Sequence, residues 1–215
     1  MNSYINSPSI LDYLVNKRHS IDSLIKEMEE YALVNKIPIL NWKAVELLEL
    51  LIVLKQPEAI LEIGTAIGYS SIRMARKLNH NVCLDTIEKS KNNLPIAQGF
   101  INKAGLADKI NILFGEAEDI MRDSTKMYDF IFLDADKLYY QSLFHLSLKL
   151  LKPGGLFFVD NLLWKGYVAD ENVPDNFVNS TKLVKDFNTL FLNNPHMDSK
   201  IFPIGDGVGI AIKRG

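Results

Sequence analysis

The chain contains 215 residues, of which 47% are hydrophobic and 23% are charged, a composition typical of a globular protein with a sizeable core. The net charge of −2 and the pI near 6.1 do not fit a protein that binds nucleic acid over its whole surface, whose pI would exceed about 9. The single cysteine, Cys83, excludes an internal disulfide and is typical of a reducing compartment. Because Cys83 lies in an apolar run, we expect it in the core.

No segment is predicted to direct the chain to a membrane or across one. The first nine residues lack a cationic region followed by an apolar stretch, so no signal peptide is expected. The longest apolar run, at 47–54, is well short of the roughly 18 apolar residues that span a bilayer. We therefore expect a cytoplasmic protein without a membrane partner.

The N-terminal part of the chain predicts three helices. Ser7-Pro8 is a typical N-cap and first-turn pair, which predicts a helix to about Lys17. Ser20 is expected to open a second helix, which Pro38 ends. Asn41 is expected to cap a third helix, and its apolar residues fall on nearly all sides, so this helix should be buried.

From residue 59 onward, strand patterns alternate with helical patterns, which predicts right-handed crossovers and a parallel sheet. The strands are nearly continuous apolar runs, as in a sheet covered on both faces. The expected strands are 59–63, 82–88, 110–114, 129–133 and 156–160. The expected helices between them are 70–78, 90–104, 116–121 and 138–151.

The C-terminal part predicts a different connection. A helix at 176–192 precedes two strands, 200–204 and 208–213, which are joined by Gly205-Asp206-Gly207. A turn this short makes an antiparallel hairpin. We therefore expect a single domain over 1–215, with N-terminal helices in 1–56 and an α/β core in 57–215.

A glycine turn follows the first strand. Its pattern, Glu62-x-Gly64-x-x-x-Gly68, differs from the Gly-x-Gly-x-x-Gly of pyrophosphate cradles and from the P-loop. Glu88 ends the second strand, where an acid that binds ribose belongs, although an exposed residue at a strand end is the alternative. Glu62 is a candidate partner for a cofactor ammonium group.

Oxygen-bearing side chains follow two later strands. Asp134 and the pair Asp160-Asn161 close strands that should be neighbours, so they should meet at one edge of the sheet. Two carboxylates and an amide oxygen suit a hard cation such as Mg²⁺ or Mn²⁺. The alternative for either aspartate is helix capping.

Three segments together resemble the S-adenosylmethionine-dependent O-methyltransferases of the catechol and caffeoyl-CoA type. They are Glu62-Ile63-Gly64-Thr65-Ala66-Ile67-Gly68-Tyr69-Ser70, Phe132-Leu133-Asp134-Ala135-Asp136-Lys137 and Val159-Asp160-Asn161. The likeness runs from about Pro38 to Lys213. It implies the class I methyltransferase, Rossmann-like fold: a seven-stranded, mostly parallel sheet with an antiparallel last strand and helices on both faces.

The resemblance also implies roles for individual residues. Residues expected to contact S-adenosylmethionine are Glu62, Gly64, Thr65, Gly68, Tyr69, Ser70, Glu88, Gly115, Glu116, Ala117 and Asp134. The expected ligands of Mg²⁺ or Mn²⁺ are Asp134, Asp160 and Asn161. The catalytic residues are expected to be Lys137, as general base, and Asp134; for Lys137 the alternative is a surface lysine at a helix start. Asp136 stands where the catechol enzymes carry an aromatic residue, which leaves ring stacking open.

The acceptor is less well defined. The segments Ile37-Pro38-Ile39 and Phe202-Pro203-Ile204-Gly205-Asp206-Gly207 resemble a bacterial branch that includes the tRNA 5-hydroxyuridine methyltransferases. This likeness implies methylation of a wobble base splayed from the tRNA anticodon loop. A small catechol-like or phenolic acceptor is the alternative, and a non-catalytic cofactor-binding module is a third. Aromatic residues expected near the pocket are Trp42, Trp164, Tyr167 and Tyr139. The apolar face of the N-terminal helices is available to dock on the body of the protein or on another subunit, and of these two we expect a homodimer.

Overall fold

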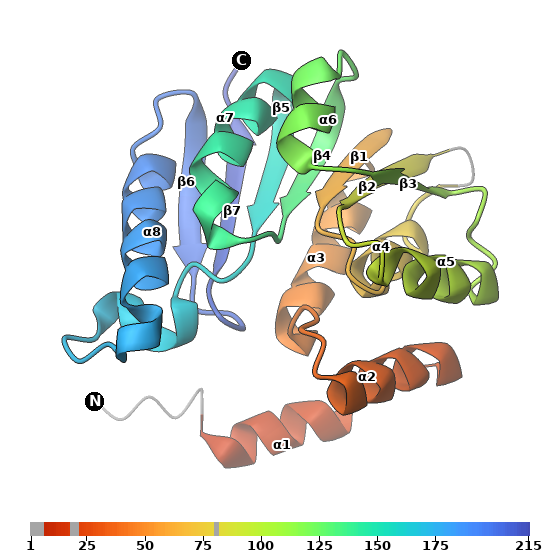
Figure 1. Cartoon of the computed structure of the whole chain (residues 1–215), viewed down its shortest axis with the longest axis horizontal. Helices are drawn as coiled ribbons and strands as arrows, with labels where there is room; N and C mark the ends of the chain where they lie inside the picture. Colours follow the sequence, from red (N-terminus) through yellow and green to blue (C-terminus); the bar gives the residue numbers. More distant parts are fainter. Residues whose placement is uncertain (1–6, 18–21, 80–81) are drawn as a thin grey trace.

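The computed structural model describes residues 7–17, 22–79 and 82–215. Within these ranges, seven strands form one sheet in the order β3-β2-β1-β4-β5-β7-β6 (Figure 1). The strands are β1 (Ala59–Ile63), β2 (Cys83–Glu88), β3 (Ile110–Phe114), β4 (Tyr128–Leu133), β5 (Leu151–Val159), β6 (Met197–Phe202) and β7 (Val208–Lys213).

The α-helices of the described residues are α1 (Pro8–Lys17), α2 (Ser23–Asn35), α3 (Trp42–Lys55), α4 (Tyr69–Ala75), α5 (Asn93–Lys103), α6 (Ala117–Asp123), α7 (Tyr140–Leu150) and α8 (Asp175–Leu192). Two 3₁₀ helices, η2 (Lys137–Tyr139) and η3 (Trp164–Ala169), follow β4 and β5. Among the described residues, no helix combines the length and apolar character needed to cross a membrane.

The strand directions confirm the predicted topology. β7 runs antiparallel to both β5 and β6, whereas β1, β2, β3, β4 and β5 pair in parallel. The last residues of three neighbouring strands are level, because Ile63 pairs with Leu133 and Leu133 pairs with Val159. The residues that follow these strands therefore meet at one edge of the sheet.

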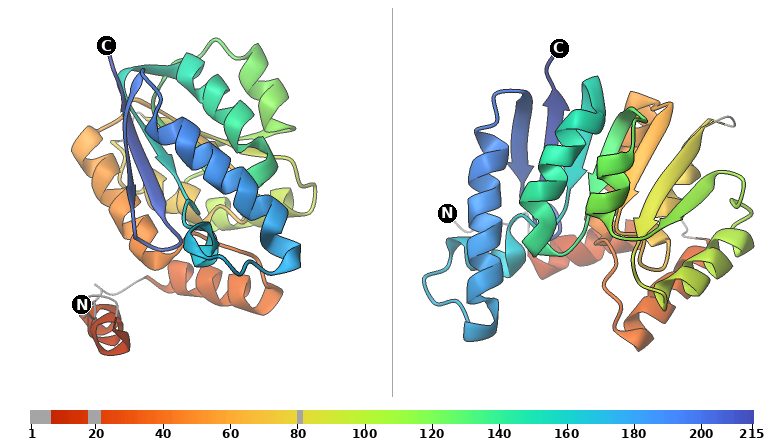
Figure 2. Two further views of the ribbon diagram at one scale, coloured as in Figure 1. Left: turned by 90° about the vertical axis from the view of Figure 1, so that its left-hand side faces the viewer. Right: turned by 45° about the horizontal axis from the view of Figure 1, so that its top comes forward.

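A different set of helices covers each face of the sheet (Figure 2), and alternate side chains of the strands are buried against each set. Ile60, Phe130 and Phe158 pack in one core with residues of α2, α3, α4 and α5. Leu61 and Phe157 pack in the other core with residues of α6, α7 and α8. Burial on both faces explains why the strands read as continuous apolar runs.

Two of the three N-terminal helix starts follow the predicted caps. Ser7 Oγ accepts from the Ile10 backbone N–H at 3.4 Å, and Asn41 Oδ1 accepts from Lys43 N–H at 3.0 Å. The second helix, α2, begins at Ser23 with Asp22 as its N-cap. The expected cap Ser20 lies outside the described residues.

The expectation that the third helix is buried on nearly all sides is wrong. α3 buries Ala44, Leu48 and Ile52, which share the side that faces the sheet. On its other side, Leu50 is 61% exposed and Leu54 is 79% exposed. Apolar residues all round a helix predict burial, but the position of α3 at the outside of the helix layer leaves this side uncovered.

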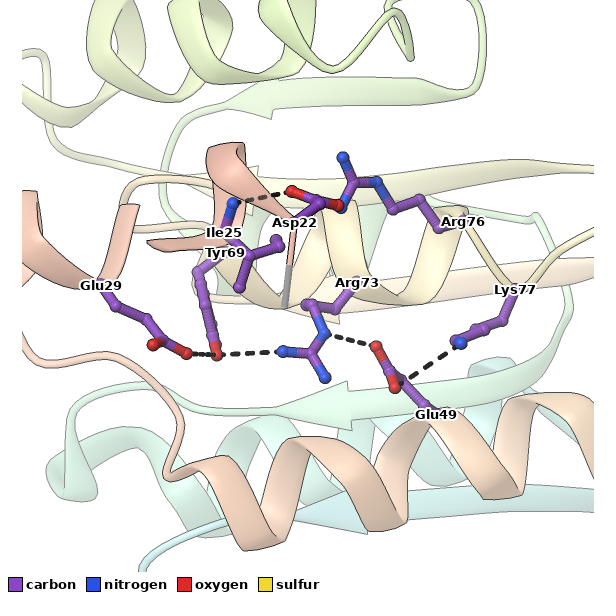
Figure 3. Close-up of polar contacts among 8 residues, drawn as sticks. All are labelled: Asp22, Ile25, Glu29, Glu49, Tyr69, Arg73, Arg76 and Lys77. Carbon is purple, nitrogen blue, oxygen red and sulfur yellow. Dashed lines mark hydrogen bonds and ion pairs between the residues drawn. The ribbon is translucent and has the colours of Figure 1, made fainter. Parts of the chain in front are cut away.

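A polar network joins α2, α3 and α4 (Figure 3). The Tyr69 hydroxyl donates to Glu29 Oε1 at 2.7 Å and accepts from Arg73 Nη1 at 3.2 Å. The Arg73 guanidinium also pairs with Glu49. Tyr69 and Arg73 are buried, so the pairing compensates for their desolvation. This network fixes α2 and α3 against α4, the helix that follows the glycine turn.

Three further sequence predictions need correction. Cys83 is exposed rather than in the core, because it is the first residue of β2 and burial begins at Leu84. β5 begins at Leu151, five residues before the expected start, since Tyr128 of β4 already pairs with it. β6 begins and ends before the expected 200–204, so the turn to β7 is longer than the predicted Gly-Asp-Gly.

Candidate active site

The carboxyl ends of β1, β2, β4 and β5 border a cleft of about 560 Å³. Ligands of open α/β sheets collect at this edge. Many of the predicted site residues line the cleft together: Gly64, Glu88, Gly115, Glu116, Ala117, Asp134, Lys137, Asp160 and Asn161. The predicted residues Glu62, Thr65, Gly68, Tyr69 and Ser70 lie behind its wall instead.

The glycine turn packs tightly against the end of β4. Gly64 has a φ of +107°, and a Cβ at this position would lie 1.9 Å from the Asp134 carbonyl oxygen. Its backbone N–H donates to the Ile87 carbonyl at 3.1 Å. Only glycine fits such a close approach with a positive φ. The turn is therefore held at the floor of the cleft.

Glu88 is buried and joins the glycine turn to the end of β2. Its Oε2 accepts from the Ala66 N–H at 2.8 Å, and its Oε1 accepts from the Ser90 N–H at 2.7 Å. The alternative of an exposed strand-end residue is wrong, because Glu88 is 7% exposed. A carboxylate has about four acceptor positions, so two remain for a ligand in the cleft.

Glu62 lies behind the cleft wall and links β1 to α4 and β2 through hydrogen bonds. It is fully buried and accepts hydrogen bonds from the hydroxyls of Ser70, Ser71 and Thr86, the last at 2.6 Å. Burial raises the pKa of Glu62 to about 7, and the three hydroxyl donors oppose this rise. The Tyr69 hydroxyl is directed to Glu29 and Arg73 (Figure 3), and Tyr69 does not line the cleft.

The two aspartates that follow neighbouring strands come together as predicted. The backbone N–H of Asp134 donates to the Ile63 carbonyl at 3.0 Å, and that of Asp160 donates to the Leu133 carbonyl at 3.3 Å. Neither aspartate is a helix cap, since Asp136 is the N-cap of η2 and Leu163 is the N-cap of η3. The capping alternative is therefore wrong for both.

The donor set fits a divalent cation. Asp160 is 4% exposed, and its Oδ1 has no hydrogen-bond partner in the described part of the chain. Burial raises the pKa of Asp160 to about 7, and the neighbouring Asp134 carboxylate adds to the rise. A cation would supply the missing partner and offset the repulsion. No three His, Cys, Asp or Glu side chains of the described residues gather as a metal centre, so the Asn161 amide would be needed.

Lys137 is buried beside these groups, so the surface-lysine alternative is wrong. Its Nζ donates to the Tyr140 hydroxyl and to Asn161 Oδ1, each at 2.6 Å, and lies 3.8 Å from Asp134 Oδ1. Burial lowers the pKa of Lys137, whereas the carboxylates of Asp134 and Asp160 raise it. Sequence reasoning missed Tyr140, whose hydroxyl also donates to the Asp160 carbonyl at 3.1 Å.

The remaining cleft wall combines apolar and charged side chains. Of the aromatic residues expected there, Trp164 and Tyr139 line the cleft, whereas Trp42 and Tyr167 do not. The Trp164 ring centre lies 5.4 Å from Lys137 Nζ. Further lining residues that the site prediction did not include are Pro38, Ile39, Lys89, Lys165 and Asp206. The sequence indicated Asp206 only as a residue of the Gly-Asp-Gly turn and not as part of the site.

Comparisons with known proteins agree on one family. The O-methyltransferase family model matches residues 16–214. A catechol O-methyltransferase from Niastella koreensis is 37% identical over 174 residues, which cover 77% of each chain. A caffeoyl-CoA O-methyltransferase from Populus kitakamiensis is 35% identical over 75% of this chain and 72% of its own. A Bacillus cereus O-methyltransferase solved in complex with SAH is 27% identical, with a TM-score of 0.84 over 96% of this chain and 97% of its own.

Proposed function

The chain belongs to the O-methyltransferase family, and on this premise we propose that it transfers the methyl group of S-adenosylmethionine to one hydroxyl of two vicinal oxygens, assisted by Mg²⁺ or Mn²⁺. The observation that carries the proposal is the unpartnered, buried Oδ1 of Asp160 beside Asp134 and Lys137. These groups share one cleft with the glycine turn and Glu88.

The chain's own residues provide a place for the cofactor. The bound SAH of the Bacillus cereus relative, the demethylated form of S-adenosylmethionine, supports this assignment. Glu88 has acceptor positions left for the ribose hydroxyls, and the glycine turn at Gly64 lets a ligand approach the backbone. Gly115, Glu116 and Ala117 line the same cleft and would border the adenine.

Proton removal from the acceptor falls to Lys137. Asp134, Asp160 and Asn161 would hold a divalent cation, whose Lewis acidity would favour the ionised form of an acceptor hydroxyl. Lys137 Nζ can accept the hydroxyl proton only in its neutral form. Burial lowers the pKa of Lys137 and so favours this neutral form. The Tyr140 hydroxyl accepts a hydrogen bond from Nζ and so positions it at the cleft. Binding the cofactor and the acceptor side by side lowers the barrier to methyl transfer further.

A small planar acceptor with vicinal oxygens fits best. The curated relatives named above are catechol and caffeoyl-CoA O-methyltransferases, which supports a phenolic acceptor. Ile39, Pro38 and Trp164 provide apolar surface on the cleft wall for a planar ring. Asp136, which replaces the aromatic residue of the catechol enzymes, also lines the cleft but offers no ring for stacking, so the acceptor ring would contact Trp164 instead.

The 5-hydroxyuridine of tRNA is a second candidate. Its 5-hydroxyl and 4-carbonyl lie on adjacent ring carbons and so offer the same pair of oxygens. Lys89 and Lys165 are exposed on the cleft wall, where they are available to contact the phosphates of an anticodon loop. The relatives' names support the smaller acceptor, so tRNA ranks second.

A comparison of acceptors tests the proposal. Purified protein with S-adenosylmethionine is assayed on a catechol and on tRNA that carries 5-hydroxyuridine, with Mg²⁺ or with EDTA, beside the variant Asp160→Ala. We expect Mg²⁺-dependent transfer to the catechol, abolished by EDTA and by the substitution. Transfer to tRNA alone would select the second candidate. Cofactor binding without transfer to either acceptor would favour a non-catalytic module.

We also propose that the N-terminal helices pair with a second copy of the chain. α1 has ten residues and buries none of them in its own chain, although an isolated helix of this length is unstable in water. Tyr13 and Leu14 of α1 are exposed, as are Leu50 and Leu54 of α3. Light scattering should give a dimer mass for the natural chain and a monomer mass for Leu50→Glu/Leu54→Glu. A monomer mass for the natural chain, or a dimer mass for both proteins, would contradict this pairing.

A further inference from the structure

The loop that carries Asn161 has an unfavourable backbone. Asn161, Trp164 and Lys165 have φ values of 62°, 46° and 59°, in the left-handed region. Each non-glycine residue in this region costs roughly 1 kcal/mol, so other contacts must hold the loop. All three residues line the cleft, and Asn161 is also a predicted metal ligand.

The segment before β7 supplies those contacts. The Leu162 N–H donates to the Gly207 carbonyl at 2.8 Å, and the Leu163 N–H donates to the Asp206 carbonyl at 2.9 Å. The Lys165 N–H donates to Asp206 Oδ1. Gly207 permits this approach, because a Cβ there would lie 2.4 Å from the Leu163 nitrogen.

Asp206 also contacts the Asn161 amide. Asn161 Nδ2 lies 3.1 Å from Asp160 Oδ2 and 3.4 Å from Asp206 Oδ2, so two carboxylates accept from its NH₂ group. Asn161 Oδ1 points the other way and accepts from Lys137 Nζ. The two ends of an amide have nearly the same shape, so their hydrogen-bond partners decide which end faces the cleft. A reversed amide would place oxygen against two carboxylates and NH₂ against the Lys137 ammonium.

We infer that Asp206 is a positioning residue, which orients the Asn161 amide so that its oxygen faces the cation site. The inference rests on the proposed function, since it concerns the cation proposed there. Asp206 uses one carboxylate oxygen for the loop backbone and the other for the amide. An asparagine at this position has only one oxygen, so it keeps one of these two hydrogen bonds and presents NH₂ to the other partner. Removal of a residue that orients a metal ligand typically weakens metal binding 10- to 100-fold.

Mn²⁺ binding to the SAH-loaded protein, measured by calorimetry, tests the inference. We expect Asp206→Asn to weaken Mn²⁺ binding about 10- to 100-fold, with SAH affinity and melting temperature equal to those of the control Asp198→Asn. Asp198 lies on β6 and forms an exposed pair with Arg214, away from the cleft. Mn²⁺ affinity within twofold of the natural chain, or a joint loss of SAH binding and thermal stability, would overturn the inference.

Repeating Asp206→Asn in a chain that also carries Asn161→Asp separates orientation of the residue 161 side chain from support of the loop backbone. In Asn161→Asp the residue has two equivalent oxygens, so its orientation no longer matters. Asp206→Asn should then cause no loss of Mn²⁺ affinity in the Asn161→Asp background, because the new NH₂ group can donate to the carboxylate oxygen that faces it. An equal loss in both backgrounds would contradict the role of Asp206. Failure of the natural chain itself to bind Mn²⁺ would instead contradict the proposed function.

Discussion

Glu62→Gln should change how the stability of the protein depends on pH. Glu62 is fully buried, and its pKa rises from 4.5 to about 7 in the folded state. Between these values the folded protein binds a proton that the unfolded chain has released, so the free energy of unfolding falls as the pH rises. The substituted glutamine keeps the size and the neutral form of the protonated side chain and removes this dependence.

The magnitude follows from the two pKa values. Between pH 5 and pH 8, ionisation of buried Glu62 lowers the free energy of unfolding by about 2 to 3 kcal/mol, whereas a glutamine at this position cannot ionise. The other carboxyls titrate in both proteins and cancel in the difference. From pH 5 to pH 8, the free energy of unfolding of Glu62→Gln should therefore rise by about 2 to 3 kcal/mol relative to that of the natural chain.

Urea unfolding followed by circular dichroism at pH 5 and pH 8 measures this gain. A difference between the two proteins that stays constant within about 0.5 kcal/mol would show that Glu62 titrates near its ordinary pKa, and the reasoning from burial would be refuted. A cofactor ammonium group beside Glu62 would favour its ionised form, so S-adenosylmethionine should reduce the gain.

Three further substitutions test the site. Asp160→Ala should abolish methyl transfer and retain SAH affinity in calorimetry; loss of both would place Asp160 in the structural core instead. Gly64→Ala should lower the free energy of unfolding by at least about 2 kcal/mol, because its Cβ would collide with the Asp134 carbonyl; Gly99→Ala, with open space around its Cβ and a helical backbone, is the matched control. Glu88→Gln should weaken SAH binding at least tenfold, and unchanged binding would exclude Glu88 from the cofactor site.

The sheet and its polar edge could be predicted because the relevant signals are local. Three of the central strands, β2, β4 and β5, have an oxygen-bearing residue at the end or directly after it, namely Glu88, Asp134 and Asp160. Parallel pairing then brings these residues to one edge without further information. The expected antiparallel hairpin at the C-terminus was predictable for the same reason, since a glycine-rich turn restricts the connection.

Other features depend on contacts between distant parts of the chain. Tyr140 reads as an apolar helix residue, and only folding places its hydroxyl on Lys137. Asp206 reads as a turn residue, although it lies 45 positions from the Asn161 amide that it contacts. The exposed side of α3 likewise depends on which elements cover it, which periodicity does not show. Sequence patterns therefore predicted many of the residues that line the cleft, but they did not predict the tertiary contacts that hold these residues in place.

Anomalous diffraction can locate the divalent cation that we propose between the ends of β4 and β5. Crystals grown with MnCl₂ and SAH should show one manganese peak about 2 Å from an oxygen of each of Asp134, Asp160 and Asn161. The absence of that peak at saturating manganese, with SAH bound in the cleft and these three side chains turned apart, would exclude a cation site here.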